Sequence, residues 1–235
     1  MRVTQLWRFP VKSLQGERLD AVGIDPLGIE GDRRWAIFDR ETGFGLTARR
    51  APELLLAAAR HRDGAVEITL PDGTVAADDE ALSTWLGRPV ALRGLAEVDT
   101  PRYENPEDPE TEAPESWRTF TGPPGAYHDA FTVTLLSVPA AHGHDPRRFR
   151  ANVVVDGGDE DALVGTTVAL GGARLQVREG VPRCVMVTRA QPGGIEVDRD
   201  VLRWIHRERA GLLSVGAAVV EPGTVRVGDE VARTG

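Results

Sequence analysis

Short strand-like segments, separated by turns rich in glycine and proline, recur along the whole 235-residue chain. Residues 2–9 and 65–70 alternate between polar and apolar side chains, which is the period of a strand with one buried face. Further strands are expected at 18–24, 35–38, 74–76, 131–136, 153–155, 164–170, 173–177, 214–220 and around Cys184. Helical patterns occur at 52–60, 78–86 and 198–209. The chain is therefore predicted to adopt a mixed, β-dominated α+β fold with barrel-like elements.

An acidic, proline-rich segment at 99–125 separates two parts of the chain. It contains few aliphatic residues, which is typical of a linker or a long loop. We therefore expect an N-terminal domain at 1–98 and a second domain at 126–235. Residues 1–16 are expected to be able to pack against both.

Composition excludes several classes of protein. The net charge of −8 argues against a general nucleic-acid binder, and no apolar run reaches the ~18 residues that a membrane span needs. The first residues lack the apolar core of a signal peptide. The single cysteine, Cys184, excludes an internal disulfide or a four-cysteine iron–sulfur cluster. We expect a cytoplasmic protein that binds neither nucleic acid nor membrane.

Cys184 has two interpretations. A free cysteine is often a small buried hydrophobe. With Arg183 beside it, Cys184 is instead typical of a thiolate that acts as a nucleophile or a metal ligand. A second unusual residue is Lys12, the only lysine beside 27 arginines. A compact ammonium group is suited to binding a phosphate, which would explain a lysine at this position. The alternative is that a lysine occurs at position 12 by chance.

Other polar residues are candidates for an anion site. Arginines at 147, 148 and 150 form either a solvated face or a cluster that converges on a polyanion. His142, His144 and Asp145 resemble metal ligands, but a solvated loop is the favoured interpretation. A thiolate together with a cationic cradle meets the needs of a molybdopterin cofactor, because soft sulfur suits the metal and cations suit the phosphate.

Seven motifs resemble those of the MOSC family in its form with a MOSC N-terminal β-barrel domain, as found in amidoxime-reducing-component-like proteins. They are F-P-V-K-S-L-Q-G (9–16), G-D-R-R-W (31–35), L-T-A-R-R-A-P (46–52), H-D-A-F-T-V-T-L-L-S (128–137), R-F-R-A-N-V-V-V (148–155), P-R-C-V-M-V-T-R-A-Q-P (182–192) and V-R-V-G-D-E-V (225–231). The motifs extend over nearly the whole chain in the family's order. The resemblance implies two β-barrel domains and the molybdenum cofactor in its molybdopterin form.

The resemblance also implies roles for individual residues. Cys184 would be the thiolate ligand to molybdenum, with Arg183 beside it as the second catalytic residue. Lys12, Ser13 and Arg33 would hold the pterin phosphate, Arg148, Arg150, Asn152, Arg183 and Thr188 would line the cofactor site, and Arg49 would lie close by. Asp129 would order the loop that enters the second domain. The sequence departs from the family at Ala151, where proline is usual, and at 212–216, where Leu-Leu-Ser-Val-Gly replaces the usual Phe-Gly.

Three functions follow from these observations. The leading hypothesis is an oxidoreductase that reduces small N-hydroxylated compounds by oxygen-atom transfer and receives electrons from a separate donor protein. The alternative is a sulfurtransferase or carbon–sulfur lyase, in which Arg183 activates Cys184 as a nucleophile. The third is a non-catalytic binding domain in which Cys184 belongs to the core.

Overall fold

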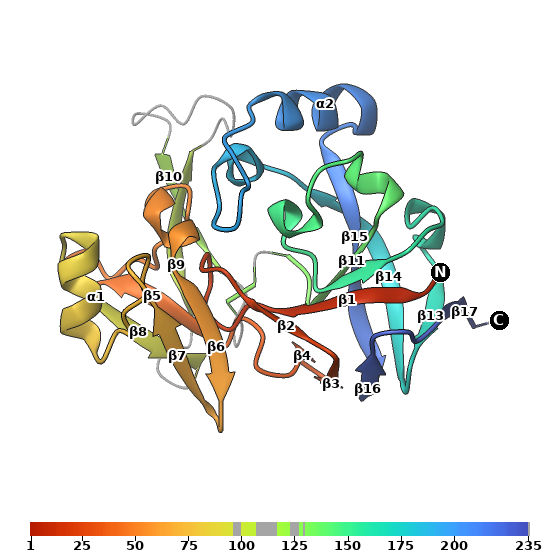
Figure 1. Ribbon diagram of the computed structural model, residues 1–235, viewed down its shortest axis with the longest axis horizontal. Coiled ribbons are helices and arrows are strands. Elements are labelled where there is room, and N and C mark those ends of the chain that lie inside the picture. Colours follow the sequence, from red (N-terminus) through yellow and green to blue (C-terminus); the bar gives the residue numbers. More distant parts are fainter. Residues whose placement is uncertain (96–99, 107–116, 123–126, 129, 235) are drawn as a thin grey trace.

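Strands dominate the computed structural model, which describes residues 1–95, 100–106, 117–122, 127–128 and 130–234. These residues contain two α-helices, α1 (Asp79–Leu86) and α2 (Asp200–Arg209) (Figure 1). The predicted β-dominated α+β fold is therefore confirmed. Neither α-helix of the described residues has the length and apolar character that crossing a bilayer would require. Asp129, with its predicted loop-ordering role, lies outside the described residues.

The largest sheet has eight strands in the order β17-β13-β14-β15-β11-β12-β1-β2. Their bounds are β1 Val3–Arg8, β2 Glu17–Leu19, β11 Val133–Ser137, β12 Val153–Val155, β13 Thr167–Leu170, β14 Ala173–Pro182, β15 Leu212–Glu221 and β17 Val231–Arg233. Only β11 and β12 run parallel, and the other pairs are antiparallel. The N-terminal strand β1 thus belongs to the sheet of the C-terminal half, and the two chain ends lie near each other (Figure 1).

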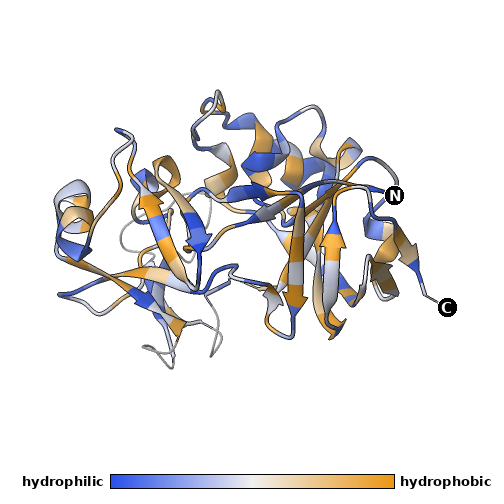
Figure 2. Cartoon of the chain, turned by 60° about the horizontal axis from the view of Figure 1, so that its bottom comes forward, coloured by the Kyte–Doolittle hydropathy of each residue, from blue (hydrophilic) through white to orange (hydrophobic). Residues whose placement is uncertain are grey.

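A three-stranded sheet packs against the large one and encloses a common core. It consists of β16 (Gly223–Arg226), β3 (Ala21–Asp25) and β4 (Gly28–Ile29). Apolar side chains from both sheets form one buried cluster that includes Val22, Val153 and Val225. Orange and pale residues alternate along several strands in Figure 2, as expected when one face of each strand is buried. Burying each such side chain stabilises the fold by roughly 1.5–3 kcal/mol.

A smaller body contains two two-stranded sheets and helix α1. The sheets pair β5 (Trp35–Asp39) with β8 (Val90–Gly94), and β6 (Ala58–Arg62) with β7 (Ala65–Thr69). Helix α1 begins where the Asp78 carboxylate accepts a hydrogen bond from the Ala81 N–H at 2.9 Å. It ends at Gly87, which adopts the left-handed conformation with φ 63°.

The predicted helix at 52–60 is wrong beyond its first turn. Residues Pro52–Leu56 form a short 3₁₀-helix, η1, and the chain then becomes strand β6. The run of leucine and alanine suits either conformation, and pairing with β7 decides in favour of the strand. The hairpin strand expected at 74–76 is reduced to a single bridge between Thr69 and Val75.

The segment predicted as a linker or loop, 99–125, contains a β-hairpin. Strands β9 (Arg102–Pro106) and β10 (Trp117–Thr121) pair over five residues each. Tyr103 is buried, and its ring stacks on Phe120 at a centroid distance of 5.4 Å. These aromatic residues supply the apolar contacts that hold two strands inside an otherwise acidic, proline-rich segment.

Residues 1–16 contact both parts of the protein. Strand β1 lies in the eight-stranded sheet, whereas Val11 and Gln15 form isolated bridges with Trp35 and Ala58 of the smaller body. The Gln15 side chain also donates a hydrogen bond to the Leu55 carbonyl at 3.0 Å. The first loop of the chain therefore lies at the junction of the two bodies.

Candidate functional site

Cys184 lies two residues after the end of strand β14 and is the N-cap residue of a short 3₁₀-helix, η7 (Val185–Thr188). The strand predicted around Cys184 is therefore wrong at this residue, because β14 ends at Pro182 and the chain turns into η7 at Cys184. The Cys184 carbonyl instead accepts a hydrogen bond from the Val187 N–H at 3.1 Å. The thiol is partly exposed, which separates it from an ordinary core cysteine.

A cavity of about 330 Å³ opens at Cys184. Five of the predicted arginines line it together with the thiol. The lining consists of Arg33, Arg49, Asn105, Phe120, His128, Ala130, Phe131, Thr134, Arg148, Phe149, Arg150, Val181, Pro182, Arg183, Cys184, Met186 and Val187. No carboxylate occurs among the described residues of this lining, although the chain as a whole carries a net charge of −8. The wall is therefore cationic and apolar, and it suits an anionic ligand with an apolar portion.

Arg183 is held by three acceptors. Its Nε donates to the Leu213 carbonyl at 2.9 Å, one Nη donates to the Phe149 carbonyl at 2.8 Å, and the other donates to the Ser214 hydroxyl. Burial lowers the pKa of the guanidinium to about 10, against the opposite influence of the neighbouring Cys184. At neutral pH Arg183 remains charged, and it lines the same cavity as Cys184.

Arg148 is buried and holds the loop that carries Cys184. One Nη donates to the Val187 carbonyl at 2.8 Å, and the other donates to the Glu196 carbonyl at 2.8 Å. Burial lowers the pKa of this guanidinium, while the nearby carboxylates of Asp198 and Asp145 oppose the shift. Arg148 therefore supplies both positive charge to the cavity and a tie between the 3₁₀-helix η5 (Pro146–Phe149) and η7.

Arg33 and Arg150 lie on the ring of Phe9. Their guanidinium carbons are 5.1 and 4.3 Å from the ring centroid. Both residues have left-handed backbones, with φ of 49° and 55°, a conformation that residues with a Cβ rarely adopt. Arg33 also pairs with Asp32, whose carboxylate accepts a hydrogen bond from the Phe9 N–H at 2.6 Å. The backbone at both arginines is thus fixed in an unfavourable conformation that aims their charges at the cavity.

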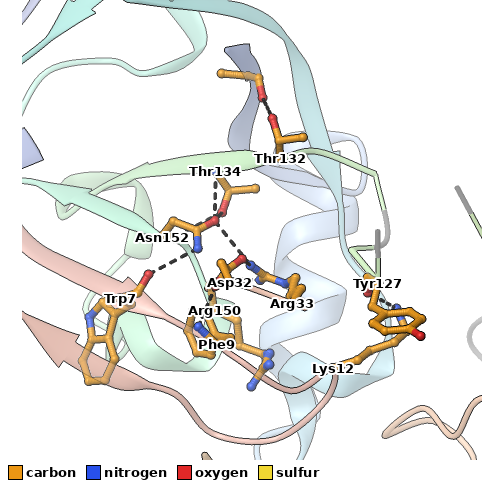
Figure 3. A network of polar contacts seen from close by, with 11 residues as sticks. Trp7, Phe9, Lys12, Asp32, Arg33, Tyr127, Thr132, Thr134, Arg150 and Asn152 are labelled. Atoms are coloured by element: carbon orange, nitrogen blue, oxygen red, sulfur yellow. Dashed lines mark hydrogen bonds and ion pairs between the residues drawn. The ribbon is translucent and has the colours of Figure 1, made fainter. Parts of the chain in front are cut away.

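Asn152 connects three segments behind these arginines (Figure 3). Its Oδ1 accepts hydrogen bonds from the Thr134 N–H at 3.2 Å and hydroxyl at 3.0 Å, and a weaker one from Arg33 at 3.4 Å. Its Nδ2 donates to the Trp7 carbonyl at 3.2 Å. Asn152 is fully buried and does not line the cavity, so the structure places it as a support of the site.

Three other predicted site residues lie outside the cavity lining. Lys12 is buried, and its ammonium group donates to the Tyr127 carbonyl at 3.1 Å and lies 4.8 Å from the centre of the Tyr103 ring. Ser13 accepts a hydrogen bond from the Ala48 N–H at 3.0 Å. Thr188 donates to the Val185 carbonyl at 2.8 Å within η7. The direct contacts predicted between these residues and the cofactor stay predictions.

The histidines at 142 and 144 participate in packing. Their rings lie 4.7 and 5.9 Å from the Trp204 ring of helix α2, and His144 lies 3.7 Å from a carboxylate oxygen of Asp198. Asp145 caps η5 by accepting a hydrogen bond from the Arg147 N–H. Within the described part of the chain, no group of three or more histidine, cysteine or carboxylate side chains could hold a metal ion. A metal at Cys184 would therefore have to bring most of its own ligands.

Sequence reasoning missed several residues that line the cavity or support its arginines. Asp32 forms an ion pair with Arg33. In the sequence it is only an acidic residue directly before a predicted arginine, and nothing else marks it. Phe120 reaches the cavity from the β9–β10 hairpin, and Phe131 and Met186 complete the apolar wall. No local pattern distinguishes these side chains from ordinary core residues. His128 also lines the cavity, next to the segment that leads into β11.

Comparison with known proteins gives two family matches. Residues 1–88 match the MOSC N-terminal beta barrel domain, and residues 132–232 match the MOSC domain. A stretch of 73 residues is 32% identical to the mitochondrial amidoxime reducing component 2 of Bos taurus. It spans 29% of this chain and 21% of that relative.

Solved structures show more distant likenesses. The YUAD protein from Bacillus subtilis is 15% identical with a TM-score of 0.49, over 98% of this chain and 93% of that one. YiiM from Geobacillus stearothermophilus is also 15% identical, with a TM-score of 0.35 over 57% of this chain and 72% of that one. At these values the likenesses have no bearing on function.

Proposed function

The chain belongs to the MOSC family, in the form with a MOSC N-terminal β-barrel domain, and we propose that it is a molybdenum-cofactor oxidoreductase that reduces N-hydroxylated compounds. One observation supports this proposal above the others. Within the described part of the chain, the partly exposed Cys184 shares a cavity with five arginines and with no carboxylate. A thiolate is a soft ligand for a transition metal, and guanidinium groups are suited to phosphate.

The side chains present fit a pterin-bound molybdenum. Because the described residues contain no group of three or more potential metal ligands, the pterin would supply the remaining sulfur ligands itself. The apolar wall of Phe120, Phe131 and Met186 suits the ring system, and the arginines suit the terminal phosphate. When bound, this cofactor supplies two-electron oxygen-atom transfer.

The chain's own residues would position and tune the cofactor. Cys184 would ligate the metal through its thiolate, and Arg183 would stabilise the negative charge on that sulfur. Arg49 is the predicted arginine best placed for the phosphate, because Arg33, Arg148 and Arg183 already donate to main-chain carbonyls. Lys12 would act indirectly, by holding the segment at Tyr127 that leads to His128.

Reduction of an N-hydroxylated compound to the amine level consumes two electrons and two protons and releases water. A single cysteine cannot hold a four-cysteine iron–sulfur cluster, and we propose that a separate donor protein supplies the electrons. The name of the Bos taurus relative, mitochondrial amidoxime reducing component 2, refers to a reaction of this type.

Activity of the purified protein tests the proposal. The protein is expressed in a host that makes the molybdenum cofactor and assayed with a simple amidoxime and reduced methyl viologen. We expect oxidation of the dye at a rate that depends on the amidoxime concentration. This activity should be lost in Arg49→Met and in Cys184→Ala. A matched control is Arg60→Met, in strand β6 outside the cavity lining. A cofactor-loaded protein that leaves the amidoxime unchanged would refute the proposed activity, and sulfane sulfur found on Cys184 would support the sulfurtransferase alternative.

A further inference from the structure

A groove of about 500 Å³ lies between η1 of the smaller body and the segment that begins with η7. We call it the η1–η7 groove. Its described lining consists of Pro52, Glu53, Leu56, Val185, Thr188, Arg189, Ala190, Val197 and Arg199. A partner seated in this groove would contact both bodies of the protein at once.

The short helix η7 separates this groove from the cavity at Cys184. Val185 and Thr188 line the groove, whereas Met186 and Val187 line the cavity. Val185 also follows Cys184 directly in the chain, so a single peptide bond joins the groove lining to the residue that carries the thiol. A group bound in the groove is therefore separated from the site of Cys184 by about one turn of 3₁₀-helix.

The groove exposes apolar side chains to solvent. Leu56 is 42% exposed, and Val197 is 62% exposed, which is the highest value among the large apolar side chains of the described residues. Pro52 is also exposed, and Val185 and Ala190 add to the apolar surface. Exposed apolar side chains that share a concave surface are typical of a protein interaction site, because their burial stabilises a complex.

The charges of the groove favour an acidic partner. Its charged side chains are Arg189, Arg199 and Glu53, so the described lining is positive in a chain with a net charge of −8. The Arg199 side chain is exposed and forms no hydrogen bond or ion pair with the rest of the described chain. It is the N-cap residue of α2, where the positive end of the helix dipole disfavours a cation. A cation held there without a partner in its own chain is suited to a carboxylate of another protein.

We propose that the η1–η7 groove is the docking site of the electron donor, and that this donor is a small acidic redox protein with an apolar patch. The proposal rests on the proposed function, which takes its electrons from another protein. Reduction of one N-hydroxylated compound takes up two electrons and two protons and releases one water. Two reduced donor molecules are therefore each oxidised by one electron, and the protons come from the solvent. A second copy of the chain fits less well, because a symmetric contact would bring Arg189 and Arg199 against the same arginines.

Two variants separate the apolar part of the contact from the charged part. Val197→Glu places a charge where the apolar patch of the donor would be buried, and it should weaken donor binding roughly tenfold or more. Arg199→Glu reverses a charge and should weaken binding roughly three- to thirtyfold at low salt, with a smaller effect at high salt. The matched controls are Val75→Glu and Arg178→Glu, which make the same changes at exposed residues outside the groove lining.

The test uses a plant-type ferredoxin, a small acidic iron–sulfur protein, as the donor. Binding of oxidised ferredoxin is measured by isothermal titration calorimetry at low and at high salt, with cofactor-free and with cofactor-loaded protein. Amidoxime reduction is then measured with reduced ferredoxin and, separately, with reduced methyl viologen. We expect Val197→Glu and Arg199→Glu to lose ferredoxin binding and ferredoxin-dependent activity, and to keep the viologen-dependent rate. Both controls should behave as the wild type does.

Unchanged ferredoxin affinity in the two groove variants would overturn the proposal, as would a wild type that binds neither ferredoxin nor an acidic flavodoxin. Loss of the viologen-dependent rate in the same variants would also count against it, because the damage would then extend to the cavity. A wild type that is dimeric in analytical ultracentrifugation, and monomeric as Val197→Glu, would assign the groove to a second copy instead. The binding measurement needs no cofactor. A protein that binds ferredoxin through the groove but leaves the amidoxime unchanged would therefore refute the proposed activity and not the docking surface.

Discussion

Replacing Asn152 with alanine should lower the free energy of unfolding by much more than the small size of the side chain suggests. Asn152 is fully buried, and its side chain makes three hydrogen bonds of 3.2 Å or shorter, two with Thr134 and one with the Trp7 carbonyl. At about 1 kcal/mol each, their loss lowers the free energy of unfolding by roughly 3 kcal/mol. For a chain of this length, such a loss corresponds to a melting temperature lower by about 6–12 °C.

The assay is thermal unfolding combined with urea denaturation, followed by far-UV circular dichroism. Asn105→Ala is the matched control, because Asn105 is partly buried on strand β9 and lines the cavity. We expect the control to lose less than about 1 kcal/mol. If Asn152→Ala also loses less than about 1 kcal/mol, then the Asn152 side chain does not hold Trp7 of β1 and Thr134 of β11 together, and our account of this support is wrong.

Three further substitutions test separate parts of the account. Arg148→Met removes two 2.8 Å hydrogen bonds to the carbonyls of Val187 and Glu196, and urea unfolding should show a loss of about 3 kcal/mol. Burial raises the pKa of Glu160, so the stability that this group contributes is present below about pH 4.5 and is lost as the pH rises through the folded-state value. The free energy of unfolding of Glu160→Gln, relative to that of the wild type, should therefore be higher at pH 8 than at pH 4. An equal difference between the two proteins at both pH values would contradict this. Lys12→Met should lower the melting temperature through its lost contact with the Tyr127 carbonyl. A lower cofactor content at an unchanged melting temperature would instead favour the phosphate role predicted for Lys12.

The elements predicted correctly are those whose pattern is local. Strand β1 shows period-two alternation, and helix α1 has an acidic N-cap and a terminal glycine, so neighbours in sequence determine them. Strand β6 was predicted as helix because a short apolar run does not distinguish the two states. The β9–β10 hairpin was hidden by the acidic and proline-rich composition around Tyr103 and Phe120. In both cases tertiary contacts outweigh local preference.

For the candidate site, the sequence indicates which residues are unusual but not where their side chains lie. Residue type singled out Cys184 and Lys12, because each is the only residue of its kind in the chain. Residue type alone does not show where a side chain lies. Five arginines line the cavity together with Cys184, whereas the Lys12 ammonium group donates a hydrogen bond to the Tyr127 carbonyl. Nor does it reveal that Arg183 needs Ser214 as an acceptor, since that contact joins β15 to the end of β14. Such contacts depend on the register of the sheet, which a single sequence does not specify.

The central claim is that the cavity at Cys184 binds a molybdenum cofactor through that thiol. The most direct measurement is molybdenum and pterin content of the wild type and of Cys184→Ala, both produced in a host that makes the cofactor. We predict close to one molybdenum and one pterin per wild-type chain, and loss of molybdenum from the variant. A wild type that contains neither, while Cys184 still reacts with a thiol reagent, would contradict the claim and favour sulfur chemistry at this cysteine.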